Sequence, residues 1–391
     1  MKKRRFSLVL TLALVLSLLC GCAGSSDTPE PDPEPELTDP VQPTPEGSVI
    51  AIGFSSLDEG AQAAVSDFLH TYYRSIGTLK VEPCASLFTT AEEAARHRAI
   101  WHTLIEIRKA SLIDLRLEEY HSVITLTDAQ SHADGTLTLT ATEDVVVRFL
   151  ATAQVESQQF GTIHTFTLQR TGQDSWLIAL HESDDNPYYS FQYDEERGQD
   201  ARLDSFLQDI ALRQTQLDKT DDLSTLHWDH DYDRSAAYTY MQTYIKTRNP
   251  IWYAYDELGG NCQNFGSQVL LAGGIPMDQQ GDAIWYWNSF EDQNFSWINV
   301  PLFMDYAKTN TGYGLVSLPD AAYYTGQTGD ILIYGDDDYD HTTVIADTIT
   351  DESGRVVDYL VCSNTSNYRN FPASAYYYTK QWLVRILGWN E

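Results

Sequence analysis

The first 48 residues of this chain are not expected to contribute to a packed core, so we predict that the globular fold is built from residues 49–391. Seven of the fourteen prolines lie between Pro29 and Pro45, interleaved with Asp and Glu, and no Lys or Arg occurs between Arg5 and Arg74. Such a segment has little to bury and repels itself, so it should be extended, at roughly 3 Å per residue where it is polyproline-like. We predict an acidic tether over residues 22–48.

A targeting signal precedes the tether. Basic residues at 2–5 are followed by an apolar run over 6–19, which is the pattern of a secretory signal peptide spanning residues 1–21. The run is too short for a stable transmembrane helix. It ends in Leu19-Cys20-Gly21-Cys22, which resembles a bacterial lipobox, so we predict lipidation of Cys22. The expected location is the extracytoplasmic face of a bacterial cell membrane; ordinary cleavage with full secretion is the alternative.

The charge and cysteine content exclude several classes of protein. Acidic residues outnumber basic ones 56 to 25, for a net charge of −31, and loss of residues 1–21 removes four bases, giving 21 − 56 = −35. Phosphate backbones should repel such a chain, so no nucleic-acid partner is expected. Beyond the signal and Cys22, only Cys84, Cys262 and Cys362 remain, too few for a disulfide framework, although a single Cys84–Cys362 bridge is an alternative. No zinc-binding spacing occurs, and we predict no metal and no cofactor.

Hydrophobic periodicity predicts an α+β fold with two domains and a connector. Residues 49–195 form the first domain, with helical periodicity followed by alternating strands. The expected helices span 56–76 and 91–117, and the expected strands 122–128, 136–141, 144–150, 162–170 and 176–182. This order resembles the cone-shaped fold of nuclear-transport-factor-like domains. Its histidines are scattered along the sequence and are interpreted as structural: His70, His97, His102, His121, His132, His164 and His181.

Residues 196–231 are predicted to be a helical connector, and residues 232–391 carry the chemistry. In Gly259-Gly260-Asn261-Cys262 the glycines permit a sharp entry, and a helix with a buried apolar stripe is predicted from Cys262 to Gly273-Gly274. A cysteine at a helix N-terminus lies at the positive end of the macrodipole, which favours the nucleophilic thiolate. The alternative is that Cys262 is a small buried hydrophobe.

A base and an orienting group occur in later strands. His341 begins a predicted strand and is the expected acceptor of the Cys262 proton. Asn364 ends the next strand and is the expected orienter of the imidazole, as in Cys-His-Asn triads. The separations are 341 − 262 = 79 and 364 − 341 = 23 residues.

Residues 232–391 resemble a family of bacterial amidase domains. The motifs that carry the resemblance agree in order and spacing over about 40% of the chain. They are Tyr232-Asp233-Arg234-Ser235-Ala236-Ala237, Gly260-Asn261-Cys262-Gln263-Asn264-Phe265-Gly266-Ser267-Gln268, Ala272-Gly273-Gly274-Ile275-Pro276-Met277, Trp285-Tyr286-Trp287, Ser296-Trp297, Gly329-Asp330-Ile331, Asp340-His341-Thr342 and Ser363-Asn364-Thr365.

The resemblance implies a papain-like cysteine hydrolase fold near the NlpC-type cell-wall peptidases. It implies Cys262 as nucleophile and His341 as base, with oxyanion or substrate binding by Tyr255, Gln263, Trp285 and Trp297. The family usually has Asp-Cys-Thr-Asn-Phe where this chain has Asn261 to Phe265, and often has histidine at the position of Asn364.

An acidic turn precedes His341. Asp336, Asp338 and Asp340 recur at every second residue, as at the start of a calcium loop, but the sixth position is His341 rather than glycine. We interpret the segment as a solvated turn, with calcium binding as the alternative. Such a turn would raise the pKa of the neighbouring imidazole by favouring its cationic form.

Together these features predict a monomeric, membrane-anchored cysteine amidase or peptidase that acts on peptide or peptidoglycan amides. Two alternatives remain. One is a catalytically silent lipoprotein that binds peptides or glycans in the same groove. The other places the function in residues 49–195, as a cone for a small ligand with the amidase as accessory.

Overall fold

The computed structural model describes residues 44–194 and 198–391, and residues 42–391 form one compact unit. Cys22 and the tether before residue 44 lie outside the described residues. Within the described ranges, no helix combines the length and the apolar character needed to cross a bilayer.

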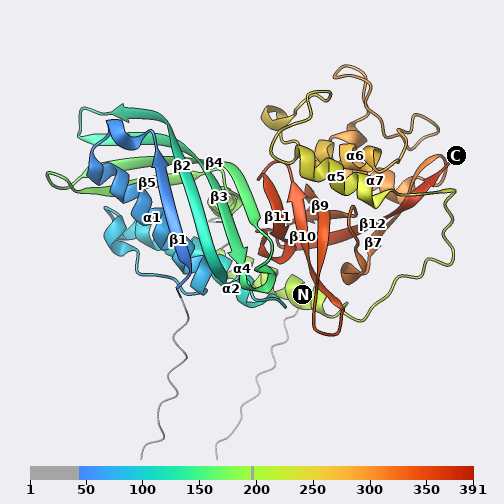
Figure 1. The fold of residues 1–391 in the computed structure, drawn as a ribbon, viewed down its shortest axis with the longest axis horizontal. Coiled ribbons are helices and arrows are strands. Elements are labelled where there is room, and N and C mark those ends of the chain that lie inside the picture. Colours follow the sequence, from blue (N-terminus) through green and yellow to red (C-terminus); the bar gives the residue numbers. More distant parts are fainter. Residues whose placement is uncertain (1–43, 195–197) are drawn as a thin grey trace, which may run out of the picture. The chain divides into compact units, whose positions relative to one another are not determined.

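In the first half of this unit, helices pack on a long curved sheet (Figure 1). Helix α1 (Glu59–Thr78) packs on β1 (Glu46–Ile52), β2 (Leu117–Ser131) and β5 (Trp176–Ser183), and α2 (Ala91–Lys109) packs on α1. The remaining elements of this half are β3 (Thr136–Phe149), β4 (Ser157–Arg170), α3 (Asn186–Asp194) and α4 (Gln199–Gln214).

The starts of α1 and α2 are specified locally. The Asp58 carboxylate accepts a hydrogen bond of 2.9 Å from the Gly60 N–H, and the Thr90 hydroxyl accepts one of 3.2 Å from the Glu93 N–H. Each side chain satisfies an N–H that has no partner within its own helix.

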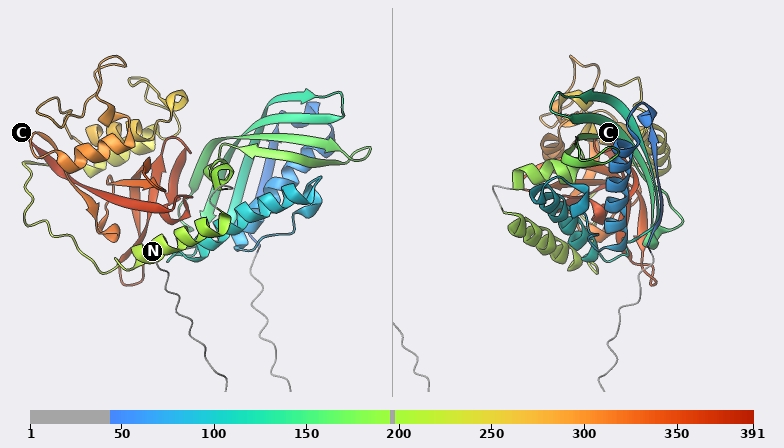
Figure 2. Two further views of the ribbon diagram at one scale, coloured as in Figure 1. Left: turned by 180° about the vertical axis from the view of Figure 1, so that it is seen from behind. Right: turned by 90° about the vertical axis from the view of Figure 1, so that its left-hand side faces the viewer.

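In the second half, three helices gather on one side of a set of strands (Figures 1 and 2). The helices are α5 (Arg234–Tyr244), α6 (Cys262–Ala272) and α7 (Val300–Thr309). The strands are β6 (His230–Asp231), β7 (Gly314–Ala321), β8 (Ile331–Gly335), β9 (Tyr339–Thr350), β10 (Val356–Ser363), β11 (Tyr368–Pro372) and β12 (Lys380–Asn390).

The strands of the described residues hydrogen-bond into one mixed sheet. Its order is β1-β2-β3-β4-β11-β10-β9-β8-β12-β6, with β5 added on β4 and β7 on β12. The halves join where Gln158 and Gln159 of β4 pair with Arg369 and Tyr368 of β11.

Two hydrophobic clusters occupy opposite faces of the sheet in the second half. Along β8, Leu332 and Tyr334 join the core shared with the first half, whereas Ile331 and Ile333 join the core under α5–α7. This is the alternation expected of a strand that is buried on both faces. The same alternation determines which way the side chains of β9 point.

The α+β expectation is confirmed in its general form, while the cone-like and papain-like resemblances stay predictions. Three boundaries are corrected. The tether does not reach residue 48, because residues 46–48 pair with residues 119–121 as part of β1. The expected strands 136–141 and 144–150 form one strand, β3, and the expected helix 91–117 ends at Lys109.

The gap between the two expected strands, at residues 142 and 143, contains Glu143. This carboxylate is buried within β3, where it forms one end of a hydrogen-bonded chain of histidines. His97 Nε2 lies 3.0 Å from His181 Nδ1, and His181 Nε2 lies 3.0 Å from His164 Nδ1. His164 Nε2 lies 3.1 Å from Glu143 Oε2, and the Tyr73 hydroxyl donates to Glu143 Oε1 at 3.0 Å. Three histidines that are far apart in sequence therefore form one polar chain inside the core.

This chain predicts a pH-dependent stability. Burial lowers the pKa of His97 to about 4 and that of His181 well below its usual value. Below about pH 6.5 these histidines are protonated in the unfolded chain but stay neutral in the folded chain. Proton binding therefore favours the unfolded chain, and the free energy of unfolding decreases as the pH falls. From His97 alone the loss between pH 8 and pH 5 should be about 2 kcal/mol.

Urea unfolding of wild type, His97→Gln and His102→Gln at both pH values measures this effect. His97→Gln should be less stable than wild type at pH 8, and the difference should shrink by about 2 kcal/mol at pH 5. His102 is an exposed histidine of the same helix, so His102→Gln controls for the loss of an imidazole that lies outside the buried chain. A constant difference for His97→Gln would contradict the prediction.

Candidate active site

Cys262 is the first residue of α6, as the sequence predicts. The preceding Gly259 and Gly260 have φ values of 108° and 114°, a left-handed region that favours glycine. A Cβ on Gly260 would lie 3.1 Å from Thr365 Oγ1, a tight contact that also favours glycine there. These two glycines turn the chain sharply and deliver Cys262 to the helix start.

The residue before Cys262 organises the loop rather than capping the helix. Asn261 makes no side-chain cap hydrogen bond; its Oδ1 accepts from the Tyr255 N–H (3.0 Å) and from Asn264 Nδ2 (2.8 Å). Its Nδ2 donates to Asn364 Oδ1 (2.9 Å), and its N–H donates to Thr365 Oγ1 (2.7 Å). The N–H groups at the start of α6 therefore receive no side-chain cap and stay available to the thiol.

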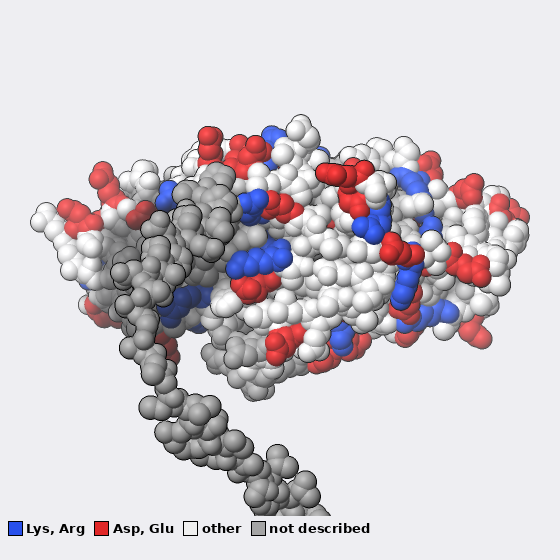
Figure 3. All heavy atoms as spheres, turned by 90° about the horizontal axis from the view of Figure 1, so that it is seen from below, with Lys and Arg blue, Asp and Glu red and all other residues white. Residues whose placement is uncertain are grey.

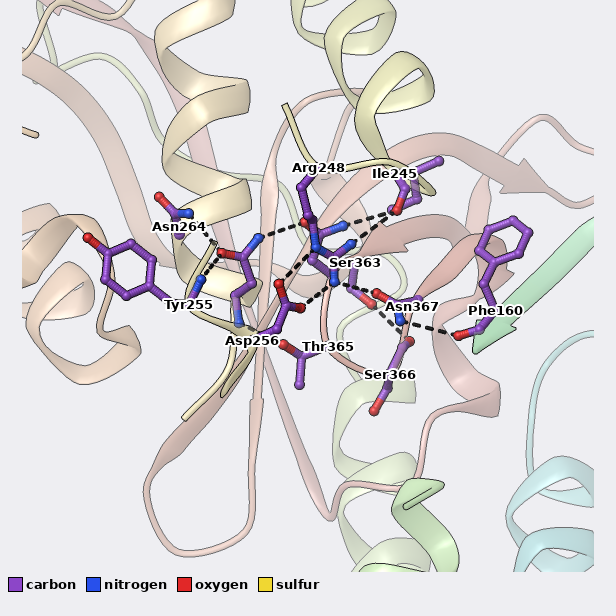
Figure 4. A network of polar contacts seen from close by, with 12 residues as sticks. Phe160, Ile245, Arg248, Tyr255, Asp256, Asn264, Ser363, Thr365, Ser366 and Asn367 are labelled. Carbon is purple, nitrogen blue, oxygen red and sulfur yellow. Dashed lines mark hydrogen bonds and ion pairs between the residues drawn. The ribbon is translucent and has the colours of Figure 1, made fainter. Parts of the chain in front are cut away.

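A second polar clamp holds the same loop (Figure 4). Arg248 makes a two-pronged ion pair with Asp256, with N···O distances of 3.1 and 2.5 Å, and donates to Asn367 Oδ1 at 2.7 Å. Asn367 Nδ2 donates to the Phe160 carbonyl of β4 at 3.2 Å. The clamp links the entry to α6 with the loop after β10 and with the first half of the unit.

Helix α6 lies directly against β9. Thr342 Oγ1 donates to Gln263 Oε1 at 2.7 Å, and Gln263 Nε2 donates to Ser267 Oγ at 3.1 Å. A Cβ on Gly266 would lie 3.0 Å from Thr342 Cγ2. The Gln263 side chain is fully buried in this contact and packs α6 against β9, so only its backbone N–H is left for the expected oxyanion role.

His341 points away from α6. The Thr342 side chain faces α6, and successive side chains of a strand alternate, so the imidazole of His341 lies on the opposite face. There it stacks on Tyr378, with ring centroids 5.7 Å apart and planes 7° apart, and it lies near Tyr376 at 6.0 Å. His341 is 3% exposed, and its Nε2 is buried with no hydrogen-bond partner.

Cys262 and His341 line the same cavity, of about 850 Å³. Gly259, Thr365 and Tyr378 also line it. Among the residues that the structure describes, no hydrogen bond joins Cys262 to His341, so the two predicted partners share a cavity without forming the expected pair.

Both groups are neutral in this arrangement. Burial raises the pKa of the Cys262 thiol to about 11, which outweighs the opposite effect of the backbone N–H groups of Thr342 and Gln263. Burial alone lowers the pKa of His341 to about 3. Two expectations are therefore corrected: the helix N-terminus does not by itself produce a thiolate, and the acidic turn does not raise the pKa of the imidazole, because desolvation outweighs both effects.

Asn364 is not placed as an orienter of His341. Its Oδ1 accepts from Asn261, and its Nδ2 donates to the Ile245 carbonyl at 3.2 Å. Neither end of the amide is hydrogen-bonded to His341 in the described part of the chain. Asn364 instead anchors the loop that carries Cys262.

The aromatic candidates lie in the core beside the cavity. Trp285 and Trp297 are 0% exposed; their indole N–H groups donate to Ser267 Oγ (3.1 Å) and to Asn264 Oδ1 (2.9 Å). Neither lines the cavity, and the expected contact of these tryptophans with substrate stays a prediction.

Tyr255 is also buried. Its hydroxyl donates to Gln293 Oε1 at 2.6 Å and accepts from the Trp287 indole at 2.8 Å. These bonds occupy the hydroxyl that the resemblance assigns to the oxyanion.

The acidic turn closes one side of the cavity. Asp336 pairs with Arg202 at 2.9 Å and accepts from the Thr379 N–H at 3.0 Å, and Asp340 interacts with the Tyr378 side chain. Across residues 44–194 and 198–391, no three or more His, Cys, Asp or Glu side chains are arranged to hold a metal ion. The carboxylate of Asp336 is thus engaged by protein groups.

Sequence reasoning missed Tyr378 and Asn261. The Tyr376-Tyr377-Tyr378 run has no strand or helix period that would assign a face, so nothing local predicted the stacking on His341. Asn261 could have been singled out as the residue that precedes the nucleophile, but its partners Asn364 and Thr365 are about a hundred residues away.

Comparison with known proteins identifies an amidase-like domain in this half of the chain. Residues 231–387 match a family described as "Putative amidase domain". The chain is also 32% identical over 120 residues to the uncharacterized protein YhbB of Bacillus subtilis (strain 168), over 29% of this chain and 37% of that protein. The chain thus matches less than two fifths of this relative's length. No solved structure matches.

The neutral state of Cys262 predicts its pattern of alkylation. Because burial holds the thiol pKa near 11, the iodoacetamide rate constant of native Cys262 should rise about tenfold per pH unit from pH 6 to pH 10, without a plateau. Peptide mapping after timed labelling would measure it. Cys84 and Cys362 are free and buried and do not line this cavity, so they should label only on unfolding. A plateau below pH 8 would instead indicate a stable thiolate–imidazolium pair.

Proposed function

We propose that the chain is a cysteine-dependent amidohydrolase, with Cys262 as nucleophile and His341 as general base. The observation that carries the proposal is that Cys262, at the start of α6, shares a cavity with a buried imidazole whose Nε2 has no partner. Buried polar atoms are nearly always hydrogen-bonded, so an orphaned one calls for a function. The match of residues 231–387 to an amidase family supports the same conclusion.

The proposed reaction proceeds through a thioester. His341 Nε2 accepts the Cys262 proton as Sγ attacks the amide carbonyl, and the N–H groups of Cys262 and Gln263 stabilise the oxyanion. The imidazolium returns that proton to the departing amine. A water molecule then loses a proton to His341 and releases the carboxylic acid, which restores the thiol. The imidazole must turn from its stack on Tyr378 to reach Sγ.

In this proposal Asn364 is a positioning residue. It was expected to orient the imidazole, and its hydrogen bond to Asn261 supports a different role, namely holding the loop that sets Cys262 at the helix start. The bond acts on the nucleophile rather than on the base.

Binding without turnover is the second candidate function. The absence of a Cys262–His341 hydrogen bond within the described residues favours it, as does the neutral state of both groups. In that case the cavity would hold peptides or glycans without cleaving them.

Substitutions at the cavity separate the two candidates. Cys262→Ala and His341→Ala should each lower turnover of peptide amides and purified wall fragments by about 10³-fold or more, because each removes a reacting group. Asn364→Ala should cost about ten- to a hundredfold, as expected for indirect support. Cys362→Ser is the matched control and should keep near wild-type turnover. If peptide amides or wall fragments bind to the wild-type protein but are never cleaved, binding without turnover replaces hydrolysis as the proposed function.

The substrate and location are proposed on the basis of the sequence. The substrate class is a peptide or peptidoglycan amide, reached by an enzyme that a lipid on Cys22 holds at the outer face of the cell membrane.

The surface of the described residues is not uniformly acidic. On the face shown in Figure 3, acidic and basic side chains lie side by side.

Cys22→Ala tests the anchor. Without the thiol no lipid can be attached, so the protein should move from the membrane fraction to the soluble extracytoplasmic fraction or stay as an uncleaved precursor. Fractionation with immunoblotting, and metabolic labelling with a palmitate analogue, would measure this. Cys20→Ala is the control and should remain lipid-labelled. Equal labelling of wild type and Cys22→Ala would contradict the assignment.

A further inference from the structure

A second, smaller cavity lies in the first half of the unit. It has a volume of about 30 Å³ and is walled mainly by apolar side chains from α1, α2, β3 and the segment after β11. A space of this size accommodates about two or three water molecules, or roughly 60–90 Å³ of liquid. That is the volume of an organic molecule of only a few heavy atoms.

A guanidinium group lines this cavity without a carboxylate partner. Arg108 of α2 is 5% exposed, its Nε is buried with no hydrogen-bond partner, and its Nη1 makes only a long bond of 3.4 Å to the Ile76 carbonyl. No ion pair within 4.0 Å joins it to any acid among the described residues. Its carbon Cζ lies 5.6 Å from the centre of the Phe149 ring.

An unpaired buried charge is costly, because its hydration is lost and nothing replaces it. Burial accordingly lowers the pKa of Arg108 from its usual value. The Asp185 carboxylate lines the same cavity and is engaged by other residues that line it: its Oδ1 accepts from Gln159 Nε2 at 3.0 Å and from the Tyr368 hydroxyl at 3.2 Å. The fold thus keeps a buried cation facing a small void.

The small cavity adjoins the cavity of Cys262. Asn186 and Ser366 line both, and both are half-buried. A group held at Arg108 would therefore lie next to the space in which a bound amide would meet Cys262.

We infer that the Arg108 cavity is a binding site for a small carboxylate group. The planar guanidinium matches a carboxylate, the apolar walls suit the short carbon chain behind it, and the volume admits only a few heavy atoms. The Asp185 carboxylate of the same cavity repels anions in proportion to their charge, so it disfavours phosphate more strongly than a singly charged carboxylate. The carboxylate comes either from a free short-chain acid or from the C-terminus of a peptide substrate; the second source rests on the proposed function.

Propionate binding to the full chain tests the site independently of activity. Calorimetric titration at pH 7 and constant ionic strength should show saturable binding of propionate, whereas propionamide, which has the same shape without the charge, should bind at least tenfold more weakly. Arg108→Met should lose propionate binding by at least the same factor. It should fold at least as stably as wild type, since it removes an unpaired buried charge.

A second variant shows whether a loss of propionate binding in Arg108→Met could come from a change in folding. Ala375 also lines the cavity, so Ala375→Leu fills the space and keeps Arg108. It should also abolish propionate binding. Equal binding of propionate and propionamide, or undiminished binding by either variant, would overturn the proposal.

Substrates distinguish the two sources. If the site takes a peptide C-terminus, peptides with a free carboxylate should have at least tenfold lower KM than their C-terminal amides, and Arg108→Met should erase the difference at unchanged kcat. If the site takes a free acid, propionate should bind while the two peptides are cut alike. Binding of propionate by a chain that cuts no peptide would reject the proposed function and leave this site standing.

Discussion

The contact of α6 with β9 determines the candidate active site. The hydrogen bond from Thr342 to Gln263 and the close approach of Gly266 to Thr342 hold the start of the helix against the strand. The contact sets Cys262 at the cavity, and strand alternation then places His341 on the opposite face. The shared cavity and the missing hydrogen bond both follow from this one packing arrangement, and the proposed catalysis requires the imidazole to move.

Desolvation is the common theme of the polar interior. It keeps the Cys262 thiol and the His341 imidazole neutral and lowers the pKa of His97 within the histidine chain. It also lowers the pKa of Arg108, whose buried charge has no carboxylate partner among the described residues to offset the lost hydration. Where partners are present, as for Glu143, the cost is offset by hydrogen bonds. Where they are absent, at His341 and Arg108, the unpaired group faces a cavity. Those two positions are where a ligand or substrate would complete the structure.

Local sequence signals predicted local features well. The glycines before Cys262 predicted the start of α6, and apolar periodicity predicted α1 and most strands of the first half. Features that depend on distant residues could not be predicted. Asn364 follows directly after β10 rather than ending it, and its partner is Asn261 rather than His341. Trp285 and Trp297 fall in family motifs, yet a motif does not say whether a side chain faces a cleft or the core. Glu143 interrupted the predicted strand because a charged residue is not expected at a buried position, and its histidine partners are not neighbours in the sequence.

Detection of an acyl thioester on Cys262 would test the proposed mechanism most directly. Wild-type protein incubated with an activated peptide ester and quenched in acid should gain the mass of one acyl group, and peptide mapping should place it on Cys262. The adduct should decay on return to neutral pH in wild type and persist in His341→Ala, because hydrolysis of the thioester needs the base. Hydrolysis of the ester with no adduct on Cys262, or with the acyl group on another residue, would contradict the assignment of the nucleophile.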